Sequence, residues 1–255
     1  MSSHPSDSNG GAPTRIAILA DVHGNLPAFE AVLGDARAEG VDAIWFLGDL
    51  VGYGAQPDEC VALALEACDV VLAGNHDLAV AGEIPVSDFS PNAAAAVRWT
   101  QGHAGPETID ALRRLRPAHE GEPIGLYHGS PRDPIWEYVL SPNDAEECID
   151  AMEPRIGAIG HTHIALRFMA GVDELLADQT PAGTEHDLAD GRWLINPGSV
   201  GQPRDHDPRA AWMLLDVERW TARWERSDYA IAEAARAIAD ARLPRHLADR
   251  LFIGR

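Results

Sequence analysis

A short apolar segment, residues 16–20, runs directly into Asp21 and His23. Its length, its β-branched residues and its polar flanks are typical of a buried strand, so a carboxylate and an imidazole follow the strand's carboxyl end. Open α/β sheets place their chemistry at this end. Asp21 and His23 can converge on one metal ion if the backbone bends after the strand, and Gly24 permits such a bend.

The same arrangement occurs four more times along the chain. Apolar segments at residues 43–47, 70–72, 125–127 and 156–159 each end in a polar loop that contains glycine. These loops carry Asp49, Asn75, His76, Asp77, His128, His161 and His163. Five strand ends with residues of metal-ligating type would be a large coincidence. We therefore predict that they meet at one edge of a sheet.

The composition is that of a globular protein. The chain has 255 residues, of which 45% are hydrophobic and 24% are charged, and an α/β fold of this size is often a single domain. No stretch approaches the roughly 20 apolar residues of a membrane helix. Residues 1–14 are polar and lack the apolar core of a signal peptide. We expect a disordered N-terminal segment at 1–14, a single domain at 15–255 and a cytoplasmic location.

The formal net charge of −20 restricts the partners, and every basic residue is an arginine. Such a field repels long nucleic acids and anionic membranes, so we expect neither as a partner. A phosphate-containing substrate would have to be attracted locally, by metal ions. The three cysteines, Cys60, Cys68 and Cys148, have neither zinc-ribbon nor redox spacing, which predicts free thiols.

The first half of the chain alternates between strands and helices. Residues 27–39 and 57–67 have helical spacing of their apolar positions, which is typical of a parallel sheet with helical crossovers. Residues 79–115 are helical in composition, with Pro91 and Pro106 placed to begin separate helices. Two interpretations of this segment stay open: a helical cap beside the active face, or ordinary packing on the sheet.

After His163 the pattern changes to short β segments with turns. They cover residues 165–169, 192–195, 211–217 and 219–226. We predict that they form a second, more antiparallel sheet packed on the first. The acidic residues 171–190 are typical of a loop, and residues 229–241 predict a helix.

Taken together, these motifs resemble the calcineurin-like metallophosphoesterase superfamily, in the family's order, over about residues 15–217. The residues that carry the resemblance are Asp21-Val22-His23, Gly48-Asp49, Gly74-Asn75-His76-Asp77, His128 and Gly160-His161-Thr162-His163. The small prokaryotic phosphodiesterase branch is the most similar, because of His23-Gly24-Asn25, His128-Gly129-Ser130-Pro131 and Asn196-Pro197-Gly198-Ser199-Val200-Gly201. The resemblance implies an α/β fold: a two-sheet β-sandwich of mixed strands flanked by helices, in four α-β-β-α layers.

The resemblance also implies two bound divalent metal ions. Asp21, His23 and His163 would bind one ion; Asn75, His128 and His161 would bind the other, with Asp49 as the bridge. Oxygen and imidazole ligands without thiolate suit Mn²⁺, Fe²⁺, Zn²⁺, Ni²⁺ or Co²⁺, and we expect Mn²⁺. Two dications against two carboxylates keep about two positive charges by simple count, which can hold a phosphate inside an acidic protein.

The implied reaction is the hydrolysis of a phosphodiester by in-line attack of a metal-activated hydroxide. His76 would act as a leaving-group acid or stabilise the pentacoordinate phosphorus. Asp77 either orients His76 or is a carboxylate at a helix N-terminus. Asn25 and Arg204 are candidate substrate-binding residues. Their alternative interpretations are a polar turn residue and a surface ion pair.

The same predicted metal ligands are also compatible with other functions. A phosphomonoesterase, including a protein phosphatase, or a dinucleoside polyphosphate hydrolase would need the same site. Protein phosphatases of this superfamily usually carry Gly-Asp-x-x-Asp-Arg, whereas this chain has Gly48-Asp49-Leu50-Val51-Gly52-Tyr53. A non-catalytic scaffold is disfavoured because no ligand is missing. We expect a small soluble phosphoester as the substrate, and the sequence leaves a homo-oligomer open.

Overall fold

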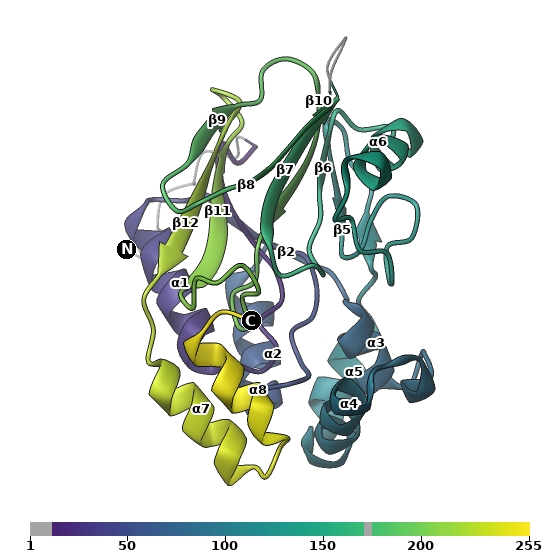
Figure 1. Cartoon of the computed structure of the whole chain (residues 1–255), viewed down its shortest axis with the longest axis vertical. Helices are drawn as coiled ribbons and strands as arrows, with labels where there is room; N and C mark the ends of the chain where they lie inside the picture. Colours follow the sequence, from purple (N-terminus) through teal and green to yellow (C-terminus); the bar gives the residue numbers. More distant parts are fainter. Residues whose placement is uncertain (1–11, 171–174) are drawn as a thin grey trace, which may run out of the picture.

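The chain folds into two six-stranded sheets with helices outside them, as seen in the computed structural model of Figure 1, which describes residues 12–170 and 175–255. The first sheet has the order β3 (Val70–Val71), β2 (Ala43–Phe46), β1 (Arg15–Leu19), β11 (Ala210–Asp216), β12 (Thr221–Ser227) and β9 (Glu185–Asp187). The second has the order β4 (Ala118–His119), β5 (Ile124–Tyr127), β6 (Ile156–Ala158), β10 (Arg192–Pro197), β7 (Ala165–Ala170) and β8 (Leu175–Gln179).

Both sheets mix parallel and antiparallel strands. In the first sheet β1, β2 and β3 are parallel, and β11 pairs antiparallel with β1. In the second sheet β5, β6 and β10 are parallel, while β4 and β7 are antiparallel to their neighbours. The predicted two-sheet α/β sandwich of mixed strands is confirmed.

The side chains of β1 show how the layers are built. Successive residues of a strand point to opposite faces of the sheet. Ile16 and Ile18 belong to a buried cluster shared with Ile156 of the second sheet, whereas Ala17 and Leu19 face a cluster that includes helix residues. The second sheet packs on its own outer face against α6 (Pro142–Ala151). The result is helix, sheet, sheet, helix.

The helices outside the first sheet are α1 (Leu26–Ala38) and α2 (Pro57–Ala67), the two predicted crossovers. Residues 79–115 hold the end of α3 (Asn75–Ala81), the 3₁₀ turn η1 (Val86–Asp88), α4 (Pro91–His103) and α5 (Pro106–Leu112). Pro91 and Pro106 begin helices as predicted. Val80, Val97 and Leu112 are buried in the same cluster as the outer face of the first sheet. Among the described helices, none combines the length and apolar character needed to cross a bilayer.

The C-terminal end of the chain folds back over the molecule. The predicted tail helix is α7 (Ile231–Asp240), and α8 (Arg245–Asp249) and the 3₁₀ turn η2 (Arg250–Phe252) follow it. Figure 1 shows these yellow elements beside α1, with the terminus returning to the middle of the molecule. The sequence patterns did not indicate α8 or η2.

Two predictions about the strands are wrong. The β11–β12 hairpin joins the first sheet, because β11 pairs with β1 along Ala17 and Leu214. The alternation of apolar and polar residues in this hairpin indicates antiparallel pairing within it, but it does not indicate which distant strand pairs with β11. Residues 175–179 and 185–187 form β8 and β9, whereas we expected a loop over 171–190, of which 171–174 lie outside the described residues. Both strands are short edges, and β9 carries the charged residues common at edges, which conceal the strand pattern.

The core assignment makes a direct prediction. Phe46 is fully buried and its ring centroid lies 6.1 Å from that of Phe29. Phe46→Ala should lower the free energy of unfolding by about 3–5 kcal/mol, because it removes apolar contacts and leaves a cavity. Phe252 is 52% exposed, so Phe252→Ala should change it by no more than about 0.5 kcal/mol. Urea unfolding of both variants tests this, and equal losses would contradict the assigned core.

Candidate metal centre

The seven predicted ligands come together in the structure. They lie in loops that follow β1, β2, β5 and β6 and at the start of α3, and each is no more than 4% exposed. The prediction of one sheet edge needs correction, because these loops belong to both sheets. The site lies at the common end of the sandwich, where Asp21, Asp49 and Asn75 from the first sheet meet His128 and His161 from the second.

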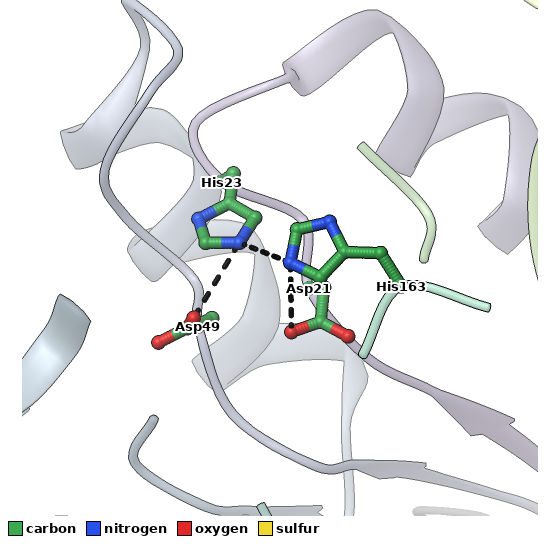
Figure 2. A group of neighbouring side chains, drawn as sticks. All are labelled: Asp21, His23, Asp49 and His163. Carbon is green, nitrogen blue, oxygen red and sulfur yellow. Dashed lines mark hydrogen bonds and ion pairs between the residues drawn. The ribbon is translucent and has the colours of Figure 1, made fainter. Parts of the chain in front are cut away.

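One half of the cluster consists of Asp21, His23, Asp49 and His163, with ligand atoms all within 4.8 Å of one another. Figure 2 shows the two imidazoles with one nitrogen of each facing the other, and with the Asp49 and Asp21 carboxylates below the rings of His23 and His163, respectively. Nε2 of His23 lies 3.1 Å from Nε2 of His163 and 3.4 Å from Oδ2 of Asp49. Nε2 of His163 lies 3.6 Å from Oδ1 of Asp21.

The other half consists of Asp49, His128 and His161, again within 4.8 Å, with Asn75 beside them. Nε2 of His128 lies 3.6 Å from Oδ2 of Asp49 and 3.2 Å from Oδ1 of Asn75. The same Asp49 oxygen therefore faces both halves. A carboxylate between two groups of imidazoles is the arrangement that a bridging ligand requires.

The hydrogen bonds of the imidazoles fix which nitrogen is free. Nδ1 of His23, His128 and His163 lies 2.9, 2.9 and 2.7 Å from the backbone carbonyl oxygens of Val51, Leu47 and Gln202, respectively. A carbonyl oxygen only accepts, so each Nδ1 carries the proton and each Nε2 keeps its lone pair. Such outer hydrogen bonds orient metal-bound histidines.

A cation fits these lone pairs. The Nε2 atoms of His23 and His163 are both acceptors and cannot bond to each other at 3.1 Å. Oδ1 of Asp21 and Nε2 of His161 are buried and have no hydrogen-bond partner within the described residues. Buried acceptors that face one another are unfavourable unless a donor or a cation lies between them. The donor set therefore suits divalent metal, and the residues present fit the ions that the resemblance implies.

Burial acts on every titratable group in the cluster. It is the largest cause that raises the pKa of Asp21 and Asp49 well above the usual range, and for Asp49 the nearby Asp77 and Asp21 add to the effect. Burial also lowers the pKa of His23 and His163 well below the usual range, and that of His128 to about 4. The imidazoles are thus neutral at pH 7, which is the form that binds metal.

The backbone at this site is unusual. Asp21, His23, Asp49, His161 and His163 all have positive φ angles, between 50° and 65°. Non-glycine residues adopt this region rarely, at a cost of the order of 1–3 kcal/mol each. Five of the seven predicted ligands therefore have a strained conformation that the surrounding packing maintains. Such strain concentrates at functional sites.

His76 lies against the cluster and is held by it. Its backbone N–H donates to Oδ1 of Asp49 at 2.9 Å, and its ring centroid lies 4.9 Å from that of His23. Tyr53 and Phe89 contact the other sides of the ring, with centroids at 4.4 and 5.0 Å. Nδ1 of His76 is buried and has no partner in the part of the chain that the structure describes. Burial, then Arg204 and His128, lower its pKa to about 3.

Asp77 does not orient His76, so that prediction is wrong. Its carboxylate accepts hydrogen bonds from the backbone N–H groups of Gly74, Asp49, Leu50 and Val51, at 2.9 to 3.2 Å. It therefore joins the N-terminus of α3 to the Asp49 loop. The alternative interpretation, a helix N-terminal carboxylate, describes it better. The sequence could not show this, because the donors of the Asp49 loop are 26 to 28 positions away.

Asn25 is also not placed to bind substrate. Oδ1 accepts from the backbone N–H of Ala28 at 3.2 Å and so caps α1, while Nδ2 donates to the Gly201 carbonyl oxygen at 2.8 Å. Both ends of this buried amide are used inside the protein. The predicted phosphate contact is therefore wrong, and the alternative of a structural polar residue holds.

Arg204 lies beside the cluster. Its guanidinium is 5.9 Å from the Tyr53 ring centroid, and Nη2 donates to Oε1 of Gln202 at 3.2 Å. The alternative of a surface ion pair is wrong, because no carboxylate among the described residues pairs with it. Its charge lowers the pKa of His163 and opposes the burial that raises the pKa of Asp21.

Some residues around the site were not predicted. Tyr53 and Phe89 pack on His76, and Ser199 donates to the Asp21 carbonyl oxygen at 2.8 Å. Asn196 donates to the Gly160 carbonyl oxygen at 2.7 Å and so supports the His161 loop. The ring of Tyr138 stacks on that of His161, with centroids 3.9 Å apart, and stays 47% exposed. The Gly-Tyr-Gly and Asn-Pro-Gly-Ser motifs were the available signals.

The chain belongs to the calcineurin-like phosphoesterase superfamily, whose domain model matches residues 14–219. The uncharacterized protein MJ0912 of Methanocaldococcus jannaschii is 36% identical over 245 residues, which cover 94% of this chain and 98% of that protein. The crystal structure of a metallophosphoesterase from Sphaerobacter thermophilus is 37% identical with a TM-score of 0.87, covering 96% of this chain and 100% of that one.

A second solved structure with a similar fold, the hypothetical protein PH1004 from Pyrococcus horikoshii OT3, is 21% identical with a TM-score of 0.77; the match covers 94% of this chain and 98% of that one. At this identity the likeness shows the fold alone. The predicted superfamily membership and the small prokaryotic branch are confirmed.

Gly74 makes the site testable without changing a ligand. A Cβ atom at this position would overlap Oδ1 of Asp49 and approach its backbone nitrogen, so Gly74→Ala must displace the shared carboxylate. We expect the variant to fold but to lose bound transition metal at least about tenfold. Gly34→Ala is the matched control because a Cβ there meets nothing within 4 Å. Elemental analysis of both purified proteins gives the answer, and an unchanged metal content in Gly74→Ala would contradict the assigned cluster.

Proposed function

We propose that this protein is a dinuclear metal-dependent phosphodiesterase that hydrolyses small phosphoesters. The observation that carries the proposal is the Asp49 carboxylate, whose Oδ2 faces His23 at 3.4 Å and His128 at 3.6 Å. Membership of the phosphoesterase superfamily supports the reaction class. The proposed ligand sets are Asp21, His23 and His163 for one ion and Asn75, His128 and His161 for the other, with Asp49 shared.

The donor set favours borderline divalent ions, and we propose Mn²⁺. Four imidazoles, two carboxylates and one amide contain no thiolate, which disfavours a soft-metal site. Two such ions, when bound, lower the pKa of water and stabilise charge on a phosphoryl group. Their positive charge would also attract a phosphate to a protein whose net charge is −20.

The chain's own residues then orient the substrate. His76 lies 4.9 Å, centroid to centroid, from the proposed ligand His23, and we infer that its ring hydrogen-bonds to a phosphoryl or leaving-group oxygen of the substrate. Arg204 supplies a guanidinium near the cluster that no carboxylate of the described chain neutralises. The hydrogen bonds that hold each Nδ1 keep the imidazoles in a fixed orientation while the substrate reacts.

The loop after Asp49 favours small diesters over phosphoproteins. At Gly52, where protein phosphatases of the superfamily usually carry an aspartate, a Cβ atom would overlap Nδ1 of His76. An acidic side chain therefore has no room at this position while His76 stays in place. Tyr53 follows and packs on the His76 ring.

The first test is metal-dependent hydrolysis of bis(p-nitrophenyl) phosphate. The Mn²⁺-loaded protein should hydrolyse it, and chelation of the metal should abolish the activity. Asp49→Ala and His161→Ala should each lower kcat/KM by at least about 100-fold, because losing a direct metal ligand should reduce activity more than losing a residue that hydrogen-bonds to a ligand, which typically costs about 10–100-fold. His119→Ala, at an exposed histidine, should retain the wild-type rate. Full activity in Asp49→Ala and His161→Ala would reject the proposed site.

The second test addresses the ester preference. Without the aspartate–arginine pair of protein phosphatases, we expect kcat/KM for bis(p-nitrophenyl) phosphate to exceed that for p-nitrophenyl phosphate. Both substrates release the same chromophore, so one assay compares them directly on the same Mn²⁺-loaded sample. Faster hydrolysis of the monoester would assign the protein as a phosphomonoesterase instead.

A further inference from the structure

Two arginines converge on one neutral acceptor beside the metal cluster. Nη2 of Arg204 and Nη1 of Arg250 both donate to Oε1 of Gln202, at 3.2 and 3.0 Å. Neither arginine pairs with an aspartate or glutamate within residues 12–170 and 175–255, although the chain has twice as many acidic as basic residues. Arg250 contacts the main-chain oxygen of Arg255, the last residue of the sequence, whereas Arg204 has no carboxyl partner among these residues. By contrast, Arg226 and Arg209 each pair with an aspartate. Two adjacent guanidiniums that share an amide oxygen have an excess of positive charge.

The pair is adjacent to the proposed metal ligands. The Gln202 carbonyl oxygen lies 2.7 Å from Nδ1 of His163, and the Arg204 N–H donates to the His163 carbonyl oxygen at 3.0 Å. The guanidinium of Arg204 lies 5.9 Å from the Tyr53 ring centroid, and that ring lies 4.6 Å from the His23 ring. The Tyr53 ring therefore lies next to both Arg204 and the proposed ligand His23.

Arg250 reaches this place because the C-terminal end of the chain folds back. Leu251 is buried in a cluster with α7, and the His206 N–H donates to the Gly254 carbonyl oxygen at 2.9 Å. Nε of Arg250 donates to the main-chain oxygen of Arg255, the last residue of the sequence, which holds the side chain in position. Figure 1 shows the terminus returning to the middle of the molecule. Arg250 lies beyond residue 219, where the match to the superfamily domain ends.

The two guanidiniums have fewer anionic partners than charges, because Arg250 alone contacts the main-chain oxygen of the last residue, Arg255. Like charges held close together repel each other, and burial disfavours the charged form further. Burial, and then Arg204, lower the pKa of Arg250 to about 10. Nε of Arg204 is buried without a hydrogen-bond partner among the described residues. Guanidinium groups in pairs bind phosphate and carboxylate oxygens with several charge-assisted hydrogen bonds.

We propose that Arg204 and Arg250 form an anion subsite, and that the natural substrate carries a second anionic group in addition to the phosphate that is hydrolysed. This rests on the proposed function, since the metal cluster is taken to hold the scissile phosphate. The second group is a phosphate or a carboxylate on the same molecule. The substrate class is therefore narrower than simple diesters: a phosphoester or phosphoanhydride with a further anion near the reacting phosphate.

The test compares matched ligands that differ by one anionic group. Calorimetry on the Mn²⁺-loaded protein measures Kd for ADP against AMP, thymidine 3′,5′-bisphosphate against thymidine 5′-phosphate, and 2-phosphoglycolate against ethyl phosphate. In the wild type we expect at least one ligand with two anions to bind about tenfold tighter than its partner, which corresponds to one or more charge-assisted hydrogen bonds. Tighter binding of ADP than AMP, or of the bisphosphate than the monophosphate, identifies the second anionic group as a phosphate. Tighter binding of 2-phosphoglycolate than ethyl phosphate identifies it as a carboxylate.

Variants then assign the advantage to the arginines. Arg250→Gln keeps a donor toward Gln202 but removes the charge, and both it and Arg250→Ala should reduce the affinity ratio to about one. Arg245→Ala removes one charge from the same segment at a side chain that is 91% exposed, and it should keep the ratio. Thermal unfolding confirms that each variant is folded. A purely structural role of Arg250 would weaken the binding of both ligands of a pair equally. The ratio of their two Kd values, measured within one variant, is not changed by such a general loss.

The outcomes separate this proposal from the proposed function. The subsite proposal would be overturned if the wild type bound no ligand with two anions more tightly than its partner with one. It would also be overturned if the tighter binding persisted in Arg250→Ala and Arg250→Gln. If metal-dependent hydrolysis is absent but the arginine-dependent affinity ratio is present, the proposed function fails and the subsite stands. If hydrolysis is normal and the ratio is one in every protein, the subsite alone fails.

Discussion

The contact between Asp49 and the two groups of imidazoles depends on how the two sheets pack. Asp49 follows β2 of the first sheet, while His128 and His161 follow β5 and β6 of the second. These side chains approach within 4.8 Å only if the buried layer between the sheets fixes their distance. Ile18, Leu126 and Ile195 belong to that layer. The apolar core of the sandwich therefore sets the geometry of the site, and a shift of one sheet would separate the two halves.

The loops at the site are held by hydrogen bonds rather than by their own preferences. Five of the predicted ligands adopt positive φ angles, which non-glycine residues avoid. The Asp77 carboxylate, with four backbone donors, and the Ser199 hydroxyl, which donates to the Asp21 carbonyl oxygen, maintain these loops. A buried carboxylate with that many donors stabilises a loop shape that the local sequence does not favour. Strain and compensation occur together, as expected where function selects the conformation.

Much of this arrangement could be predicted from the sequence, because the signals are local. Apolar runs that end in glycine-containing polar loops indicated the strand ends, and proline marked the starts of α4 and α5. The capping role of Asn25 was missed although its partner Ala28 is only three positions away. The assignment of β11 to the first sheet, the Asp49-loop donors of Asp77 and the contact of Asn25 with Gly201 were also missed. Each of these long-range contacts depends on a partner whose position only the folded chain defines, as with Gly201, 176 positions from Asn25. Local sequence patterns indicate which residues can bind metal, whereas long-range hydrogen-bond partners become evident only in the folded structure.

The position of Arg250 extends this reasoning to substrate choice. The strand-end loops carry the metal-ligating groups and lie within the residues that match the superfamily domain, so they define the reaction class but not the substrate. Selectivity must come from groups that surround the cluster and differ among proteins with the same fold. In a chain with net charge −20, an arginine pair without an aspartate or glutamate partner among the described residues weakens the negative field over a short distance. In the proposed subsite, the second charge of an anionic substrate would fix its orientation toward the proposed metal centre, whereas most of the acidic surface would repel it.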